Sequence, residues 1–591
     1  MKKIKFSKIF VLLIAVIMVL SAVPTGMLTA SAATGKTYYV SVDGKDKSKG
    51  LSPDEPMSLL KANSTVLKGG DKMLFKRGDL FYGNFIPIVR STTDKNRVEI
   101  DAYGEGPLPT LSYAKIVSDG WVDCGNGFYK FDFSKTDKYE GVKDRNGNVG
   151  FFRDKDGKYY GGLYANAEEC KEKYDFYCEE TTIYVKTDKD PYKELGTLKM
   201  AVSGNDGSLI RVDKGVNVSN IKMEYCGYGI TWNSTAKADR RKFSKITGCV
   251  FDNLGGTNIH FGYGDGQVIR GGNGVEWFNA GSNTEITNCI FRNIFDVGFT
   301  CQGRDPSDWK NNLLKDNVFA FNTQAIEFWS TNTAGNAGIF NLDFTNNLCV
   351  NNGESWAIPW RPGAINTTDL LIYSYTSPVW DVSMEGNTFY HTYEGNNVAY
   401  YCHGNSVEKF FKSFKIDNNH LYFLNENSNV FQTDDQGPEQ YRNLTPNFKD
   451  WQAMTGYDKN STFMAIGDNL DKYAEFEKIA YTSDNYHEIV KAAVDAGLKV
   501  NAKYDEELAK KNVSSGNSSD SDSNSNASEE LPITIIIIAI AAVVVVVIIV
   551  VIIIIVVTGK KSNNTVVAEV SDSKAVKETS ETSEQDNNDA E

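Results

Sequence analysis

The chain has 591 residues, with 62 Lys and Arg against 76 Asp and Glu, and a formal net charge of −14. This acidic balance disfavours nucleic acid or an anionic membrane surface as a partner. With 50 Gly, 30 Tyr and 32 Phe, the composition is typical of a large β-rich protein and not of a helical one.

The amino terminus has the pattern of a secretory signal over residues 1–33. Four lysines precede an apolar run, Ile9 to Leu20, and small residues follow at Ala30-Ser31-Ala32-Ala33. Nine cysteines at irregular spacing give no disulfide framework for an exported chain. Cys170 and Cys178 are the one pair that could form a disulfide, and the other cysteines are expected to be buried thiols.

Residues 34–215 are expected to form an N-terminal cap and the first coils of a solenoid. The stretch "TYYVSVDGKDKSKGLSPDEPMSLLKAN", followed by "GGDKMLFKRGDLFYG", predicts a strand, a Gly/Asp loop, a short helix and another strand. Such a cap would cover backbone groups that the open end of the first coil leaves unpaired.

Residues 216–432 contain seven copies of one unit with a period of about 30 residues and longer intervals where loops are inserted. The copies share one equivalent position: Asn220, Cys249, Cys289, Asn317, Asn347, Asn387 and Asn419. Within each copy, apolar residues alternate over a few positions and are interrupted by Asn and Gly, which indicates short strands and tight turns. The prediction is an all-β, right-handed parallel β-helix, because stacked coils bring like residues into columns.

Two columns follow from this alignment. Cys249, Cys289, Asn317 and Asn347 are expected to be structural ladder residues. The residues at or after each anchor are expected to form or flank one inward stack: Ile221, Val250, Ile290, Val318 and Leu348.

The opening of the chain also carries a resemblance. Tyr38-Tyr39-Val40-Ser41-Val42-Asp43-Gly44, with Gly50-Leu51-Ser52-Pro53 and Pro56, resembles the entry segment of the pectate-lyase-like superfamily of right-handed parallel β-helix proteins. Members of this superfamily are commonly secreted bacterial proteins that act on polysaccharides. The resemblance extends over roughly Thr37 to Gln432 and implies the fold, whereas lyases, hydrolases, epimerases and non-enzymatic proteins share that fold.

A second stretch narrows the resemblance within the superfamily. Gly274-Val275-Glu276-Trp277, then Asp296-Val297-Gly298 and Gln302-Gly303, then Glu327-Phe328-Trp329, is similar to a subset that resembles glycoside hydrolases. The chain lacks the Asp-Pro-His-Glu stretch of alginate epimerases and an obvious Arg-X-Pro-X-X-Arg of pectate lyases.

Glu276, Asp296 and Glu327 are the predicted catalytic residues. If Ile259, Phe299 and Ile326 point inward in equivalent strands, alternation places His260, Thr300 and Glu327 on the outer face. Glu276 would return to that face on an extra strand, and Asp296 lies at a turn between the two glutamates. Carboxylates about 5 to 10 Å apart suit glycoside cleavage. The structural alternative is that the acids are buried between aromatic rings and accept hydrogen bonds.

Aromatic and polar residues of the same coils are the predicted substrate-binding groups: His260, Trp277, Gln302, Trp329, Trp360 and Arg361. Trp356, Tyr400 and Tyr401 belong to the same cluster of rings, whose flat faces suit the C–H faces of sugars. The alternative for each of these aromatic residues is that it packs in the core and does not bind a sugar. Arg361 could pair with the carboxylate of a uronic acid, or it could support a loop.

Three functions remain open at this stage. The first is a glycosidase that cleaves a polysaccharide or an oligosaccharide with paired carboxylates. The second is a Ca²⁺-dependent polysaccharide lyase, for which Asp265 and Asp296 are the best placed acids. The third is a glycan-binding or adhesion protein without catalysis. No other metal or cofactor is expected, and the protein is expected to be a monomer.

The last part of the chain predicts an anchor. Residues 433–511 turn to helical spacing and are expected to cover the last coils, and residues 512–530 form a Ser/Asn/Asp-rich linker. Residues 531–558 form an apolar run long enough for one transmembrane helix, and residues 559–591 an acidic tail. Lys560 and Lys561 place that tail in the cytoplasm, so the bulk of the protein is expected outside the cell membrane. Leu531-Pro532-Ile533-Thr534 lacks the glycine of a wall-sorting signal.

Overall fold

The computed structural model describes residues 35–500, with gaps at 204–206, 233–236, 265, 305–307, 336, 362–366 and 394–396. The expected signal, linker, transmembrane segment and cytoplasmic tail lie outside the described residues. Within the described part, no helix has both the length and the apolar character needed to span a membrane.

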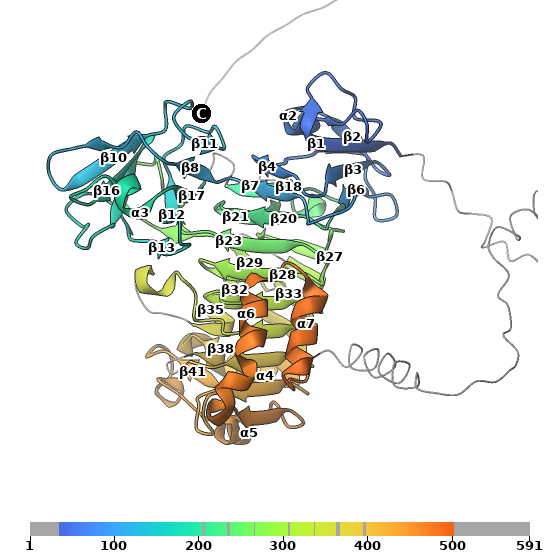
Figure 1. Cartoon of the computed structure of the whole chain (residues 1–591). Coiled ribbons are helices and arrows are strands. Elements are labelled where there is room, and N and C mark those ends of the chain that lie inside the picture. The colour runs from blue at the N-terminus through green and yellow to red at the C-terminus, as the bar shows by residue number, and fades with distance from the viewer. Residues whose placement is uncertain are drawn as a thin grey trace, which may run out of the picture. The chain divides into compact units, whose positions relative to one another are not determined.

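Three long parallel sheets form the body of the protein (Figure 1). Sheet 1 contains β1 (Thr37–Lys45), β3 (Lys72–Lys76), β6 (Val98–Tyr103), β19 (Val216–Ser219), β22 (Lys245–Thr247), β27 (Gly281–Thr287), β30 (Asp308–Lys315), β33 (Gly338–Thr345), β36 (Val379–Glu385) and β39 (Phe414–Asp417). Sheet 2 contains β4 (Leu80–Tyr82), β7 (Thr110–Ser112), β20 (Lys222–Glu224), β23 (Val250–Leu254), β28 (Ile290–Ile294), β31 (Val318–Ala320), β34 (Leu348–Val350), β37 (Thr388–His391), β40 (His420–Phe423) and β42 (Thr462–Ala465). Sheet 3 contains β18 (Ser208–Val212), β21 (Tyr228–Trp232), β26 (Val275–Phe278), β29 (Val297–Gly303), β32 (Gln324–Ser330), β35 (Thr368–Tyr375), β38 (Val398–Cys402) and β41 (Phe431–Thr433).

The chain visits the three sheets in turn. One coil runs through β27, β28 and β29, and the next runs through β30, β31 and β32, each strand pairing in parallel with its equivalent in the coil before. This arrangement is a parallel β-helix, so the fold predicted from the repeat is confirmed. Parallel connections of this kind are nearly always right-handed.

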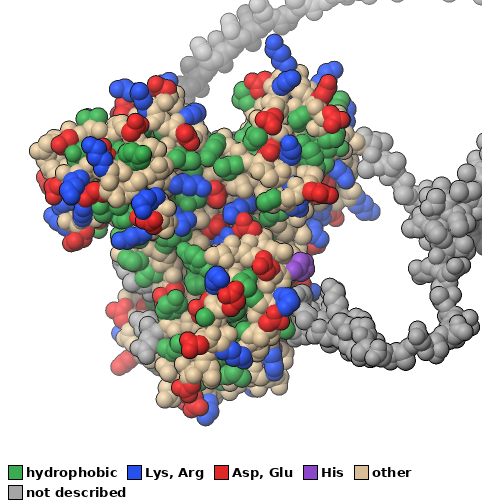
Figure 2. Space-filling model, in the orientation of Figure 1, with side chains coloured by type: hydrophobic (Ala, Val, Ile, Leu, Met, Phe, Trp, Pro, Cys, Tyr) green, Lys and Arg blue, Asp and Glu red, His purple; other side chains and the backbone are tan. Residues whose placement is uncertain are grey.

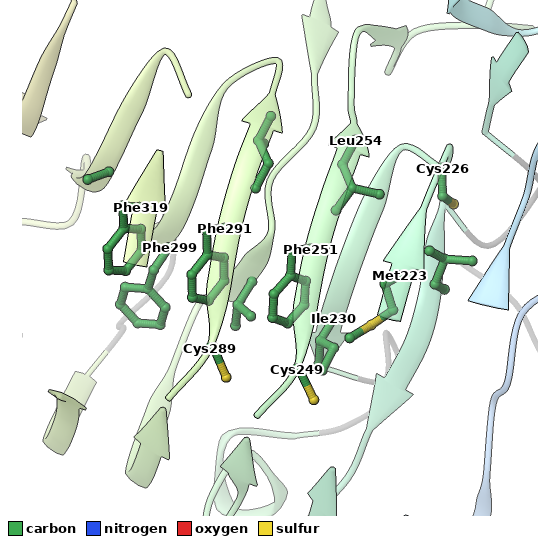
Figure 3. Packing of buried hydrophobic residues seen from close by; sticks show 14 of the residues in the cluster. Met223, Cys226, Ile230, Cys249, Phe251, Leu254, Cys289, Phe291, Phe299 and Phe319 are labelled. Carbon is green, nitrogen blue, oxygen red and sulfur yellow. The ribbon is translucent and has the colours of Figure 1, made fainter. Parts of the chain in front are cut away.

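The interior of the coils is a set of stacked side chains (Figure 3). The rings of Phe251, Phe291 and Phe319 are nearly parallel, with centroids 4.5 and 4.7 Å apart. Cys249 and Cys289 lie beside them and are fully buried. All nine cysteines are free thiols, including Cys170 and Cys178, so the bridge considered for that pair is absent.

A ladder of amide side chains runs along the entry to sheet 2. Asn317 donates to Asn347 at 3.0 Å, and the same bond links Asn347 to Asn387 and Asn387 to Asn419. The residue before each ladder position has a positive φ, a conformation that Gly and Asn adopt at low cost: Asn220, Gly248, Asn288, Asp316, Asn346, Gly386 and Asn418. The ladder prediction is confirmed, except that Ile221 and not Asn220 is the equivalent residue in the first copy.

The predicted inward stack of Ile290 and its equivalents is wrong. Val250, Ile290, Val318 and Leu348 follow the ladder position, and alternation turns them to the outer face of sheet 2. There they form a buried apolar cluster with α6 (Ala474–Thr482) and α7 (Tyr486–Asp495), which run alongside the coils (Figure 1). Arg292 connects the two parts through ion pairs with Asp252 and Asp484.

The remaining elements lie at the two ends of the solenoid or in the loops between its strands. At the start, α2 (Leu59–Asn63) follows β1, and β2 (Val66–Lys68) pairs with β5 (Ile88–Arg90). At the other end, α5 (Phe448–Thr455) places buried Trp451 against Phe431 and Tyr400, with ring centroids 4.8 and 5.3 Å apart. The short helices are η2 (Ala238–Arg240), η3 (Ile358–Trp360), η4 (Gly404–Ser406), α4 (Val407–Ser413), η5 (Glu439–Tyr441) and η6 (Gly467–Tyr473).

A separate subdomain is inserted between β7 and β18, which the sequence did not reveal. It consists of two five-stranded, mainly antiparallel sheets. One contains β8 (Lys115–Val117), β11 (Glu140–Gly141), β12 (Val149–Arg153), β13 (Tyr159–Tyr160) and β17 (Leu198–Val202). The other contains β9 (Val122–Asp123), β10 (Phe128–Asp132), β14 (Leu163–Tyr164), β15 (Phe176–Glu179) and β16 (Thr182–Lys186), and α3 (Pro191–Leu195) follows β16.

The surface carries both signs of charge. Figure 2 shows Lys and Arg interspersed with Asp and Glu over the visible face. On this face the two signs of charge are mixed, and neither forms an extended patch.

Candidate active site

Glu276 and Glu327 lie in one outward column of sheet 3. Glu276 on β26 pairs with Thr300 on β29, which pairs with Glu327 on β32. The two glutamates are therefore two strands apart, about 10 Å between their backbones. Both point away from the interior, because their neighbours in each strand belong to the buried core.

The register behind this column differs from the expected one. Val275, and not Ile259, pairs with Phe299, which pairs with Ile326. Ile259 is 46% exposed, on a long excursion between β23 and β26 that contains the two-stranded hairpin β24 (Thr257–Asn258) and β25 (Arg270–Gly271). The segment with Glu276 is thus itself the strand of the coil.

A small residue at the beginning of each of these strands fixes the register. A Cβ on Gly229, Gly274 or Gly298 would lie 2.5 to 2.6 Å from a phenylalanine ring of sheet 2, closer than any contact a side chain tolerates. The resulting motif is a small residue, then apolar, polar and apolar residues. It recurs as Gly229-Ile230-Thr231-Trp232, Gly274-Val275-Glu276-Trp277, Gly298-Phe299-Thr300-Cys301 and Ala325-Ile326-Glu327-Phe328.

Glu276 is held by one neutral donor. The Nδ2 of Asn273 donates to its Oε2 at 2.7 Å. Burial of the carboxyl group raises the pKa of Glu276 to about 7, and the charge of Asp296 adds to this rise. A glutamate in this state holds a proton over part of the neutral range.

Glu327 has a similar environment and is only 7% exposed. Its Oε2 accepts hydrogen bonds from Gln302 Nε2 at 2.5 Å and from Thr300 Oγ1 at 3.1 Å. Burial raises the pKa of Glu327 to about 7, again with a contribution from Asp296, while Arg361 and the two donors oppose the rise.

Asp296 lies at the turn before β29 and is paired with Arg361. The Nη1 of Arg361 is 2.5 Å from Oδ1 of Asp296 and also donates to the carbonyl of Phe295 at 3.3 Å. Since Asp296 raises the pKa of both glutamates, it is the charge that the two have in common. The structure thus brings the three predicted catalytic acids and Arg361 into one cluster.

Tyr228 is a member of this cluster that the sequence did not indicate. Burial raises its pKa well above the usual value, and Glu276 and Asp296 contribute to the rise. Its hydroxyl therefore stays protonated and is able to donate a hydrogen bond near the acids. Tyr228 comes immediately before Gly229 in the recurring motif, as Asn273 comes before Gly274, and this equivalence was the available signal.

Three of the predicted sugar-binding rings are buried instead. Trp277 has no exposed surface, stacks on Trp232 with centroids 4.3 Å apart, and donates from Nε1 to Thr284. Tyr400 and Tyr401 are 0% and 4% exposed. These residues are part of the packing, because alternation turns Trp277 and Tyr400 inward. Tyr401 continues the outward column of Glu327 but packs against Leu371 and Val398.

Trp356 and Trp360 attach the loop after β34 to the inserted subdomain. Trp356 stacks on Tyr159 with centroids 5.2 Å apart, and its Nε1 donates to the carbonyl of Asn293. The carbonyl of Trp360 accepts from the half-buried Arg270, which also donates to the carbonyls of Gly150, Gly161 and Gly256. Arg270 thereby joins subdomain, hairpin and loop beside the acids, and burial lowers its pKa to about 9.

Gln302 and Trp329 keep their predicted place beside Glu327, in the outward column that also contains Phe278. His260 does not. It lies on the excursion, in ring contact with Tyr263, and lines a pocket of about 670 Å³ shared with the inserted subdomain. None of the three acids lines that pocket.

The candidate calcium ligands can be placed only in part. Asp265 falls outside the described residues, whereas Asp296 is paired with Arg361. In the described part of the chain, no group of three or more His, Cys, Asp or Glu has the arrangement of a metal site.

Comparison with known proteins assigns neither a family nor an activity to the chain. No protein-family description and no curated protein matches the chain. Among solved structures, XylC in complex with xylose has 12% identity and a TM-score of 0.37, over 72% of this chain and 82% of that chain. A GH136 lacto-N-biosidase from Eubacterium ramulus has 12% identity and a TM-score of 0.36, over 73% and 67%. A Paenibacillus alginate lyase has 11% identity and a TM-score of 0.33, over 72% and 99%. These low scores carry no argument about the reaction.

Proposed function

We propose that this protein is a glycoside hydrolase whose active site is the acid cluster on the outer face of sheet 3. The observation that supports this most is the pair of outward glutamates with pKa values raised to about 7, on either side of a charged aspartate. Glycoside cleavage requires one carboxyl group that holds a proton and one that is ionised, and this cluster contains both kinds.

The residues then have distinct roles. Glu276 or Glu327 donates a proton to the glycosidic oxygen as general acid, because a pKa near the working pH makes that transfer efficient. Asp296, fixed by Arg361, is the ionised carboxylate that faces the developing positive charge at the anomeric carbon. Gln302 and Trp329 lie next to Glu327, where they can orient the sugar.

Leaving-group chemistry distinguishes the acid from its neighbours. An aryl glycoside with an acidic phenol needs little protonation, so loss of the general acid should affect it far less than it affects an alkyl glycoside. Glu276→Gln and Glu327→Gln are compared on both substrate types. The variant that recovers on the aryl glycoside identifies the acid, and a variant that is equally impaired on both identifies a carboxylate with another role.

The two other functions are separated by the products. We would incubate the full chain, purified in a mild detergent, with arabinoxylan, galactan, polygalacturonate and alginate. Reducing ends without the ultraviolet absorbance of an unsaturated sugar support hydrolysis. Both signals together support a lyase, with or without Ca²⁺ ligation by Asp296. Binding with neither signal supports an adhesion protein and contradicts our proposal.

The location of the protein remains a proposal from the sequence. The apolar run 531–558 and the linker 512–530 would hold the solenoid outside the cell, close to its own membrane, with the tail 559–591 inside. Protease treatment of intact cells that removes the solenoid and spares the tail would agree with this topology.

A further inference from the structure

A stripe of outward side chains runs beside the two glutamates on sheet 3. It lies two residues further along each strand, where alternation returns to the outer face. Phe278 pairs with Gln302, Gln302 with Trp329, and Trp329 with Tyr373. The next strand continues it with His403, whose amide donates to the carbonyl of Ile372 at 3.0 Å.

The rings of this stripe are accessible, unlike those of the interior. Phe278 is 39% exposed and Tyr373 is 38% exposed, and Trp329 keeps partial exposure next to the guanidinium of Arg304. Polar groups alternate with the rings at Gln302 and His403. Flat rings next to hydrogen-bonding groups suit a sugar chain, which presents C–H faces and hydroxyl edges.

The ring of Tyr373 is held in place by residues that no catalytic role uses. The imidazole of His403 meets it edge-on, with centroids 4.4 Å apart and planes at 81°. The Nδ1 of His403 in turn lies against the carboxylate of Asp434, and the imidazole also contacts the ring of Tyr401. The carboxylate of Asp434 is fixed by the amides of Gly404 and Gln436 at 2.8 and 3.0 Å.

We infer that Tyr373, positioned by His403 and Asp434, is a distal subsite for the same glycan chain that the acid cluster cleaves. This inference rests on the proposed function. Phe278 and Tyr373 are three strands apart, about 14 Å along the face, which is further than one sugar ring extends. The substrate class is therefore an oligosaccharide or polysaccharide that spans several sugars, with Phe278, Trp329 and Tyr373 as stacking platforms.

The alternative occupant of an exposed aromatic stripe is a protein. Continuity favours the glycan, because the column of Tyr373 includes Gln302, which donates to Glu327 within the acid cluster. A chain bound at the acids in the direction of the solenoid axis would meet Trp329 and then Tyr373.

Binding is tested apart from catalysis by native affinity electrophoresis of the full chain in gels that contain arabinoxylan, galactan, polygalacturonate or alginate. Glu327→Gln is the parent, since it slows turnover during the run. Tyr373→Thr is added to this parent, because Thr is also favoured in strands. Binding should weaken, so that the apparent dissociation constant obtained from the retardation rises by about tenfold. Tyr192→Ala is the matched control, because Tyr192 is similarly exposed, at 40%, but lies on α3 of the inserted subdomain.

The outcomes separate this inference from the proposed function. The distal subsite would be overturned if the parent and the Tyr373→Thr variant were retarded equally and melted at the same temperature. Absence of retardation in all four polymers would overturn it too. If Tyr192→Ala lost retardation as well, the effect would not be specific to Tyr373, which would also overturn the inference. Retardation that depends on Tyr373 in a protein that cleaves none of the polymers would support the subsite and contradict the hydrolase.

Discussion

Replacing Glu327 by Gln should stabilise the protein at alkaline pH and leave it unchanged at acidic pH. Burial raises the pKa of Glu327 from 4.5 to about 7 in the folded state. Between these values the folded protein holds a proton that the unfolded chain has released, so the free energy of unfolding falls as pH rises through this window. The wild type has its full stability below pH about 4.5 and has lost this contribution above pH about 7.

The magnitude follows from the shift. A difference of about 2.5 pKa units corresponds to roughly 3 kcal/mol, an upper value because the amide must replace the same hydrogen bonds. Gln cannot ionise, and its carbonyl oxygen can still accept from Gln302 and Thr300. The variant should therefore unfold at a higher temperature than the wild type at pH 8 and at the same temperature at pH 4.5.

The assay is thermal unfolding of the full chain at both pH values, at one scan rate, followed by intrinsic fluorescence. Glu475→Gln is the control, because Glu475 is exposed on α6 and should show no pH-dependent gain. A Glu327→Gln protein that melts below the wild type at pH 8 would refute the reasoning. That result would mean that Glu327 is an ionised, structurally bonded carboxylate.

Three further predictions concern other parts of the molecule. Asp296→Asn removes the charge that raises both glutamate pKa values, so kcat/KM should fall and the alkaline limit of the residual kcat/KM should move to lower pH; an unchanged limit would exclude that coupling. Ile290→Asp places a charge under α6 and α7, so limited proteolysis should release the C-terminal helices while sheet 3 keeps its activity; resistance equal to the wild type would contradict the outward placement. Trp277→Ala empties a core position and should cost about 3–5 kcal/mol of stability, with activity following the folded fraction; a stable variant with weakened glycan binding would restore Trp277 to the binding site.

The solenoid could be predicted from the sequence because each repeat has similar residue types at equivalent positions as well as a similar length. The ladder from Asn317 to Asn419 and the phenylalanine stack recur in each coil, and columns of like residues are a direct consequence of parallel pairing. The inserted subdomain has no such period. Its antiparallel strands pair within residues 115–202, so no comparison between coils could separate it from the first coils.

The site was only partly predictable, for two physical reasons. The excursion after β23 contains an alternating segment around Ile259 that competes with the true strand at Val275, and only the steric demand on Gly274 decides between them. The face of a residue is also reversed by a shift of one position, which is why Trp277 and Ile290 were assigned to the wrong faces. Glu276 and Glu327 escaped this error because each lies directly between two core residues of its strand.

The central claim is that the outward glutamates perform chemistry, and the most direct measurement is the turnover of Glu276→Gln and Glu327→Gln on the polymer that the wild type cleaves. Both variants should fold as the wild type does and lose about 10²-fold or more of kcat, the usual scale for an acid or base. Wild-type kcat in both variants, with unchanged melting at neutral pH, would contradict the account and leave the exposed stripe of Phe278, Trp329 and Tyr373 as a binding surface without catalysis.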